Sequence, residues 1–143
     1  MATHYLVDTN VWSETTTKLP NPEVVAWLRK NEQQLFISAL SIGEIKSGID
    51  QLPESGMRRP RYQSWLTDLI DRMEGRVLSF NTSVAVVWGQ LIASSLAQGV
   101  KLPTTDSMIA ATAKRHSLVI ATRNEADFAR TGVKVVNPFS SVS

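Results

Sequence analysis

The sequence predicts an α/β protein: a mostly parallel sheet of about four to five strands, covered by helices on both faces so that the fold has three layers. Short apolar runs alternate along the chain with longer segments in which apolar residues recur every three or four positions. The runs are typical of buried strands, and the longer spacing is typical of amphipathic helices. Such alternation favours parallel strands joined by right-handed crossovers. The expected strands are 5–7, 35–37, 77–80, 118–121 and 133–136.

Two helices are expected in the first half of the chain. Residues 22–31 follow Asn21 as N-cap and begin with Pro22, whose missing N–H costs nothing at a first helical position. Residues 40–49 carry three isoleucines at helical spacing, although two glycines weaken this helix by up to about 1 kcal/mol each. Residues 51–60 contain two prolines and a glycine and are expected to form a loop.

The second half contains the two strongest amphipathic patterns, at 62–73 and 84–96. They fall in the middle of the chain and are expected to form a helical hairpin on one side of the sheet. The other helical segments expected here are 104–116, capped by Thr104 or Thr105, and a single turn at 125–129.

Length and composition predict one globular domain spanning residues 1–143. The chain is 43% hydrophobic and has no cysteine, which excludes disulfides, thiolate zinc sites and cysteine nucleophiles and fits a reducing cytoplasm. The N-terminus lacks the basic region and the long apolar run of a signal peptide. No apolar stretch approaches the roughly 20 residues that a membrane helix needs. We therefore expect a cytoplasmic protein with no membrane partner.

The formal net charge of +2 does not by itself require a nucleic-acid partner. Arg58, Arg59 and Arg61 nevertheless lie within four positions, and such a cluster can contact phosphates. A solvated turn before a helix is the favoured interpretation of this cluster.

Four of the 13 acidic residues occupy positions that suggest a site. Asp8 directly follows a buried strand, where a carboxylate without a partner is costly. Glu44 lies near the apolar side of its helix, Asp106 lies in a first helical turn, and Asp127 follows the strand 118–121. Taken singly, Asp106 is equally well a helix-dipole partner. Glu44 is more readily a surface residue, and Asp127 more readily caps a turn.

If the four carboxylates converge, they need a compensating charge. Two carboxylates about 4 Å apart repel each other by roughly 4 kcal/mol at an effective dielectric constant near 20. Such a cluster takes up protons or binds cations. Oxygen ligands without a nearby histidine or cysteine favour Mg²⁺, with Mn²⁺ as an alternative, over zinc. A water activated by the metal is then a candidate nucleophile toward a phosphate ester.

The residues around these acids resemble the four acidic motifs of PIN-domain ribonucleases, and in particular the VapC-type toxins of bacterial type II toxin–antitoxin modules. The resemblance runs in order over essentially the whole chain. Each motif alone is weak, but four in order are specific. The motifs are residues 6–11, 41–45, 106–113, and 122–124 with 127–128; residues 132–133 and 137–139 also match.

The resemblance implies a role for each acid. Asp8 and Asp106 match the acids that hold the divalent metal most directly. Glu44 matches an acid that completes the pocket from a facing helix, and Asp127 matches the fourth, most variable acid. Some family members have an acid where this chain has Asn124, so whether Asp127 or Asn124 fills the fourth position stays open.

The polar neighbours of the acids also have counterparts in the family. Thr9 and Asn10 match residues that support the first acid, and Thr122 matches a polar residue near the site.

The implied function is that of a toxin: an Mg²⁺-dependent endoribonuclease that hydrolyses structured RNA such as tRNA. The resemblance further implies a homodimer and a small antitoxin that inserts a peptide, often with an arginine, into the acidic pocket. The apolar stripes at 62–73 and 84–96 are candidates for the antitoxin groove, although at least half of their residues are expected to be core.

Two other interpretations remain. The chain is alternatively a catalytically weak module that binds RNA or antitoxin through a retained acidic pocket. A phosphatase or receiver-type domain phosphorylated at Asp8 is disfavoured, because haloacid-dehalogenase-type enzymes need an acid where this chain has Asn10.

Overall fold

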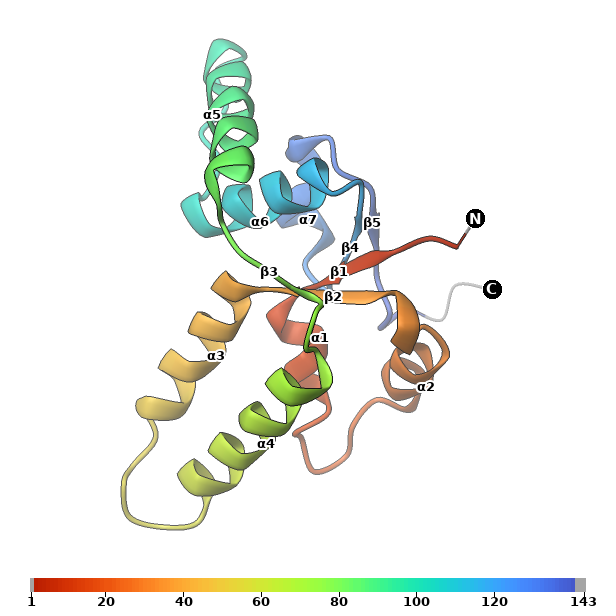
Figure 1. The fold of residues 1–143 in the computed structure, drawn as a ribbon, viewed down its shortest axis with the longest axis vertical. Helices are drawn as coiled ribbons and strands as arrows, with labels where there is room; N and C mark the ends of the chain where they lie inside the picture. Colours follow the sequence, from red (N-terminus) through yellow and green to blue (C-terminus); the bar gives the residue numbers. More distant parts are fainter. Residues whose placement is uncertain (1, 141–143) are drawn as a thin grey trace.

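The computed structural model describes residues 2–140 and is built around a five-stranded sheet in which all neighbouring strands are parallel (Figure 1). The strand order is β3-β2-β1-β4-β5, with β1 in the centre. The α/β class, the parallel sheet and the number of strands are as predicted. The strands are β1 (Tyr5–Val7), β2 (Leu35–Ser38), β3 (Val77–Leu78), β4 (Val119–Ala121) and β5 (Val135–Val136).

Helices cover both faces of the sheet, so the three-layer prediction is confirmed. Figure 1 shows α1 to α4 on one side of the sheet and α5 to α7 on the other. No helix within residues 2–140 is long and apolar enough to cross a membrane. The helices are α1 (Thr9–Glu14), α2 (Pro22–Lys30), α3 (Ala39–Asp50), α4 (Arg58–Arg72), α5 (Thr82–Ala97), α6 (Thr104–Arg115) and α7 (Glu125–Phe128).

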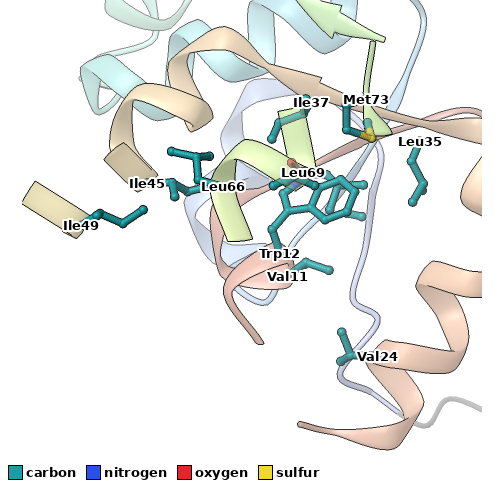
Figure 2. Packing of buried hydrophobic residues seen from close by; sticks show 12 residues of the cluster. Val11, Trp12, Val24, Leu35, Ile37, Ile45, Ile49, Leu66, Leu69 and Met73 are labelled. Carbon is teal, nitrogen blue, oxygen red and sulfur yellow. Dashed lines mark hydrogen bonds between the residues drawn. The ribbon is translucent and has the colours of Figure 1, made fainter. Parts of the chain in front are cut away.

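Each face of the sheet has its own hydrophobic core, because successive strand side chains point to opposite faces. In β1, Val7 packs into the core beneath α1 to α4, while Leu6 packs into the core beneath α5 to α7. In β4, Ala121 packs into the core beneath α1 to α4, and Ile120 packs into the core beneath α5 to α7. Figure 2 shows the first of these cores, where the indole of Trp12 lies among aliphatic side chains from β2, α3 and α4.

The apolar stripes of α4 and α5 mainly build these cores. Leu66, Leu69 and Met73 of α4 are buried, as are Val84 and Leu91 of α5. The apolar residues that remain exposed on these two helices are Ile70, Val86 and Leu96.

The expected pairing of the two middle helices is wrong. The structure has a helical hairpin, but it is formed by α3 and α4, while α5 packs along α6. The chain passes from β2 to β3 through α3 and α4, and then returns across the sheet to β4 through α5 and α6. Right-handed crossovers in opposite directions place their helices on opposite faces. The edge strand β3 therefore separates α4 from α5.

Three helix starts also differ from prediction. Helix α4 begins at Arg58, so Pro60 lies inside its first turn, where proline is tolerated. Helix α6 is preceded by Pro103 as N-cap, so Thr104 is its first residue and neither Thr104 nor Thr105 caps it. The short helix α1 was not predicted; it starts directly after β1, with Asp8 as its N-cap.

The strand order creates a natural site between β1 and β4. From β1 the chain first adds β2 and β3 on one side of the sheet. It then crosses back and adds β4 and β5 on the other side of β1. In open parallel sheets, ligands bind beyond the carboxyl ends of strands where the order reverses in this way. Asp8 follows β1 and Thr122 follows β4, so both lie at this crevice.

Candidate active site at the carboxyl ends of the central strands

Asp8 is the most buried of the predicted site carboxylates, with 8% of its surface exposed. Its backbone N–H donates to the carbonyl of Ala121 at 2.9 Å, which fixes the residue between β1 and β4. Its Oδ1 accepts the backbone N–H of Thr9 at 2.9 Å, as an N-cap residue does at the start of a helix. The carboxylate is therefore held at the end of β1 by the backbone on either side of it.

The other oxygen of Asp8 is held by side chains from two elements. Thr122 Oγ1 donates to Asp8 Oδ2 at 2.9 Å, and Asn10 Nδ2 lies 3.3 Å from the same oxygen. Thr122 Oγ1 in turn accepts Asn10 Nδ2 at 3.1 Å and the backbone N–H of Asn124 at 3.0 Å. Asn10 Oδ1 accepts the backbone N–H of Arg123 at 3.0 Å. This network sets the orientation of the Asp8 carboxylate, the arrangement by which ligand-supporting residues act in metal sites.

Glu44 is brought to Asp8 by α3, which begins immediately after β2. The hydroxyl of Ser38 caps this helix by accepting the N–H of Leu40 at 3.1 Å. Glu44 lies in the second turn, and its Oε1 accepts the hydroxyl of Thr9 at 3.2 Å. Thr9 thus contacts Asp8 through its backbone and Glu44 through its side chain.

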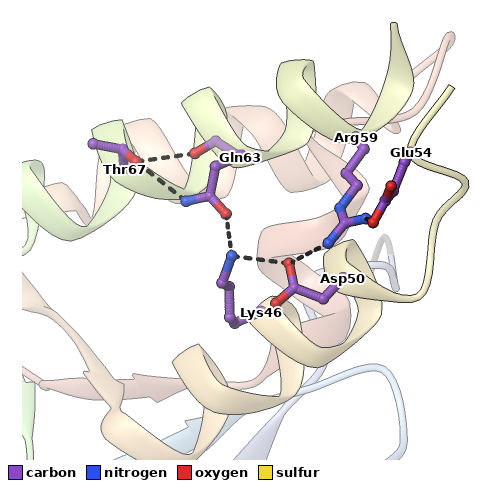
Figure 3. A network of polar contacts seen from close by, with 6 residues as sticks. All are labelled: Lys46, Asp50, Glu54, Arg59, Gln63 and Thr67. Atoms are coloured by element: carbon purple, nitrogen blue, oxygen red, sulfur yellow. Dashed lines mark hydrogen bonds and ion pairs between the residues drawn. The ribbon is translucent and has the colours of Figure 1, made fainter. Parts of the chain in front are cut away.

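Helix α3 is tied to α4 by a surface network that Figure 3 shows. Lys46 Nζ donates to Asp50 and to Gln63, and Arg59 pairs with Asp50 and Glu54 at 3.6 and 3.5 Å. Exposed pairs of this kind contribute little to stability. Arg59 is consequently engaged within the α3–α4 hairpin. The expected turn before a helix is wrong, because Arg58, Arg59 and Arg61 lie in the first turn of α4 itself.

Asp106 and Asp127 complete the acidic group from the other face of the sheet. Asp106 is partly buried in the first turn of α6, and Asp127 is exposed on α7. The charge of Asp127 acts on both Asp8 and Asp106. Asn124 donates its backbone N–H to Thr122, and whether its side chain or Asp127 fills the fourth position stays a prediction.

Crowding and burial raise the pKa of three of these carboxyl groups. For Asp8, loss of hydration raises the pKa, and hydrogen bonds from Thr122, Thr9 and Asn10 offset part of this rise. For Glu44 and Asp106, burial again raises the pKa, and neighbouring carboxylates raise it further. The site therefore concentrates negative charge that protons or a cation would relieve.

The carboxylates are close enough to repel one another but are not drawn together. Within residues 2–140, no three Asp, Glu or His side chains are grouped tightly enough to hold one metal ion as they stand. Among the described residues, the carboxylates therefore influence one another electrostatically without forming a ready-made metal cage.

The raised pKa of Asp106 predicts a pH-dependent difference in stability between the wild type and Asp106→Asn. A raised pKa means that the folded state binds the proton more tightly than the unfolded state does. Protonation of Asp106 therefore adds to the free energy of unfolding at low pH. This contribution is lost as pH rises from the ordinary value of 3.8 through the raised one. In metal-free buffer, the wild type should lose unfolding free energy relative to the variant over this range, by less than about 1 kcal/mol because Asp106 is partly exposed.

Urea denaturation of both proteins between pH 3.5 and 8 measures this difference. Comparison with the variant is needed because Asp50, whose pKa is lowered by its hydrogen bond to Lys46, changes stability in the opposite sense in both proteins. A wild type that gains stability relative to Asp106→Asn as pH rises would contradict the charge-crowding argument.

Several contacts at the site have no signal in the sequence. Trp88 Nε1 donates to the buried Ser107 Oγ at 3.0 Å, and Ser107 Oγ donates to the carbonyl of Thr104 at 2.7 Å, which secures the first turn of α6. Arg123 lies with its guanidinium carbon 4.3 Å from the ring centroid of Phe139. Both pairings join segments whose spacing fits no motif. The cap formed by Asp8, in contrast, is readable from an Asp that precedes a helix-compatible segment.

Comparison with known proteins identifies the family to which this arrangement belongs. The PIN domain matches residues 5–134. The chain belongs to the PIN-domain family. The match contains all four predicted acids, and the resemblance proposed from the motifs is confirmed at the level of the family.

Relatives match this PIN domain over nearly its full length. Toxin FitB of Neisseria gonorrhoeae is 33% identical over 135 residues, covering 94% of this chain and 97% of FitB. The VapC ribonuclease Y4jK of Sinorhizobium fredii is 32% identical and covers 94% and 96% of the two chains. A solved structure of FitAB bound to a DNA fragment superimposes with a TM-score of 0.89 at 32% identity, covering 97% of this chain and 98% of the other.

Proposed function

We propose that this single-domain PIN protein is the toxin of a toxin–antitoxin pair and acts as a divalent-metal-dependent endoribonuclease on structured RNA such as tRNA. The observation that carries the proposal is the hydrogen-bonded Asp8 carboxylate at the sheet crossover, surrounded by the charges of Glu44, Asp106 and Asp127. The relatives Toxin FitB and VapC ribonuclease Y4jK, described above, support the same activity.

The chemistry of the donor set fits a hard divalent cation. Asp8 and Asp106 are the residues we expect to hold it, with Glu44 beside them and Asp127 as the fourth carboxylate. All four present only oxygen donors, the type that Mg²⁺ and Mn²⁺ prefer. The raised pKa values of Asp8, Glu44 and Asp106 show that added positive charge would stabilise the ionised site.

The protein's own residues prepare this site in three ways. Thr122, Asn10 and the Thr9 N–H orient the Asp8 carboxylate, so that it need not be ordered when substrate binds. Thr9 couples Glu44 to the same network. The Trp88–Ser107 contact holds the helix turn that carries Asp106.

A bound divalent cation would lower the pKa of water and stabilise negative charge on the phosphate in a hydrolysis of this kind. The reaction adds the oxygen of water to phosphorus and breaks one phosphorus–oxygen bond, which leaves one phosphate end and one hydroxyl end. Asp8, Glu44 and Asp106 concentrate the negative charge that attracts the cation, and their ionisation sets the pH at which the site becomes competent.

The proposed partners are a small antitoxin protein and a second copy of the chain. The FitAB complex supports the first, since a protein similar to this one is solved there with its partner. The exposed Val86 and Leu96 of α5 are available for contact with another protein. Both partnerships are proposals for this chain.

The test is metal-dependent cleavage of bulk tRNA by the purified chain. We expect cleavage in Mg²⁺ or Mn²⁺ and none in excess chelator, with activity restored when the metal is returned. Under the same conditions, Mg²⁺ at ten times its Kd should add about 1.4 kcal/mol to the unfolding free energy. Binding of tRNA without cleavage in either metal would favour the binding-module alternative, and cleavage that survives the chelator would refute metal dependence.

A further inference from the structure

Arg123 is the residue that joins the Asp8 network to the exposed rim of the site. It directly follows Thr122, and its backbone N–H donates to Asn10 Oδ1 at 3.0 Å. Asn10 and Thr122 both bond the Asp8 carboxylate. The backbone of Arg123 is therefore fixed relative to the Asp8 carboxylate.

The guanidinium of Arg123 lies on an aromatic ring instead of pairing with a carboxylate. Its central carbon is 4.3 Å from the ring centroid of Phe139, within the range of a cation–π interaction. Within residues 2–140 it forms no salt bridge, although Asp8 and Asp127 are near in sequence or in space. In the part of the chain that the structure describes, the guanidinium charge is thus not paired with any carboxylate.

Phe139 is a firm support for this cation. Its ring packs against the core beneath α1 to α4, and its backbone N–H donates to Asn137 Oδ1 at 2.9 Å. A stacked guanidinium still presents its edge donors to solvent, and those donors match the oxygens of a phosphate. The arrangement orders the arginine before any ligand arrives, which reduces the entropy lost on binding.

The proposed metal ion would offset charge at the reacting phosphate only. A neighbouring phosphate of the same RNA still meets the remaining carboxylates, so a further cation at the rim favours its binding. Arg123 is fixed at this place by its backbone bond and by the ring beneath it. We propose that Arg123, held on Phe139, binds an RNA phosphate that flanks the cleavage position and determines substrate binding. The proposal rests on the ribonuclease function proposed above and assigns a specific residue to hold its substrate.

The experiment measures binding of a fluorescently labelled tRNA transcript to the full chain carrying Asp106→Asn, which prevents cleavage. In this background Arg123→Gln should weaken binding about tenfold, the loss expected for a charge-assisted hydrogen-bonding pair. The slope of log affinity against log salt should fall by about 0.7 to 0.9 for each phosphate contact removed. The affinity of Arg123→Lys should lie between those of the parent and of Arg123→Gln, because lysine keeps the positive charge but lacks the planar guanidinium fork.

Two further variants separate substrate binding from a structural role. Arg115→Gln makes the same charge change at the C-terminal end of α6, the opposite end of the helix from Asp106, and should leave affinity unchanged. Phe139→Leu removes the cation–π contact but keeps the charge, so it should weaken binding less than Arg123→Gln and preserve the salt slope. Thermal unfolding should show similar small losses for Arg123→Gln and Phe139→Leu.

The proposal is overturned if Arg123→Gln affects binding no more than Arg115→Gln, or if Phe139→Leu reproduces its full effect and its salt slope. It is also overturned if the parent chain does not bind the transcript. Cleavage by the wild type is assayed separately. A protein that binds tRNA through Arg123 without cleaving it would disprove the nuclease function and retain the binding role.

Discussion

Asp8→Asn should reduce RNA cleavage on the order of 10³-fold, the rate equivalent of several kcal/mol of charge stabilisation. Asn has the shape of Asp but removes one of the charges that we expect to hold the cation. Asp8 is also the acid with the most hydrogen bonds from its surroundings, so no neighbouring acid is equally well ordered to replace it. Initial rates of tRNA cleavage at saturating Mg²⁺ measure the effect.

The variant should stay folded, which separates chemistry from stability. The side-chain oxygen of Asn can still accept the Thr9 N–H. The amide nitrogen cannot accept the hydrogen bonds that Thr122 and Asn10 donate to Asp8 Oδ2, which costs stability, but loss of the buried charge offsets this cost. Neutralising a buried group whose pKa is raised also removes a desolvation cost, so the unfolding free energy at pH 7 should not fall by more than about 1 kcal/mol.

Asp68→Asn is the matched control for Asp8→Asn. It makes the same chemical change at an exposed position on α4 and should leave the cleavage rate unchanged. If folded Asp8→Asn cleaved RNA at the wild-type rate, the acidic group at the carboxyl ends of β1 and β4 would not be the catalytic site.

The parts of this fold that are local in sequence are those that the sequence predicts well. The strand at 5–7 is apolar on both faces because two cores flank it, and helices such as α2 carry their own N-cap and amphipathic pattern. Asp8 could be singled out because a carboxylate after a buried strand requires compensation. Its neighbours Thr9 and Asn10 follow from the same position.

The features that the sequence did not predict depend on contacts between distant segments or on weak local patterns. Helix α1 is six residues long, and its two apolar residues, Val11 and Trp12, are too few to show a helical period. The pairing of α5 with α6 follows from the reversal of strand order at β3, which no single segment encodes. Likewise, the Thr9–Glu44 bond joins residues 35 apart, and only the completed sheet brings them together.

Thr122→Val should lower both activity and stability, because one hydroxyl makes three of the contacts that organise the site. Thr122 is fully buried; its Oγ1 donates to Asp8 and accepts hydrogen bonds from Asn10 and from the N–H of Asn124. Val has nearly the same shape but leaves these groups without their partner. We expect a loss of about 1–3 kcal/mol in unfolding free energy and a 10- to 100-fold loss of cleavage, approximately what supporting residues contribute in metal sites.

The direction of the pH effect identifies Thr122 as a positioning residue for Asp8. Its hydrogen bond lowers the pKa of Asp8, so removal of the hydroxyl raises that pKa further and should move the acidic limb of the cleavage profile to higher pH. The Mg²⁺ concentration for half-maximal activity should rise as well. Thr122→Ser keeps the hydroxyl and loses only a methyl group, so it should restore the pH profile while remaining somewhat destabilised. If Thr122 has only a structural role, Thr122→Val and Thr122→Ser should lose activity in proportion to their loss of stability, and the acidic limb of the pH profile should not move. That result would show that Thr122 does not position Asp8 for catalysis. Asn10 and the Thr9 N–H would then orient Asp8.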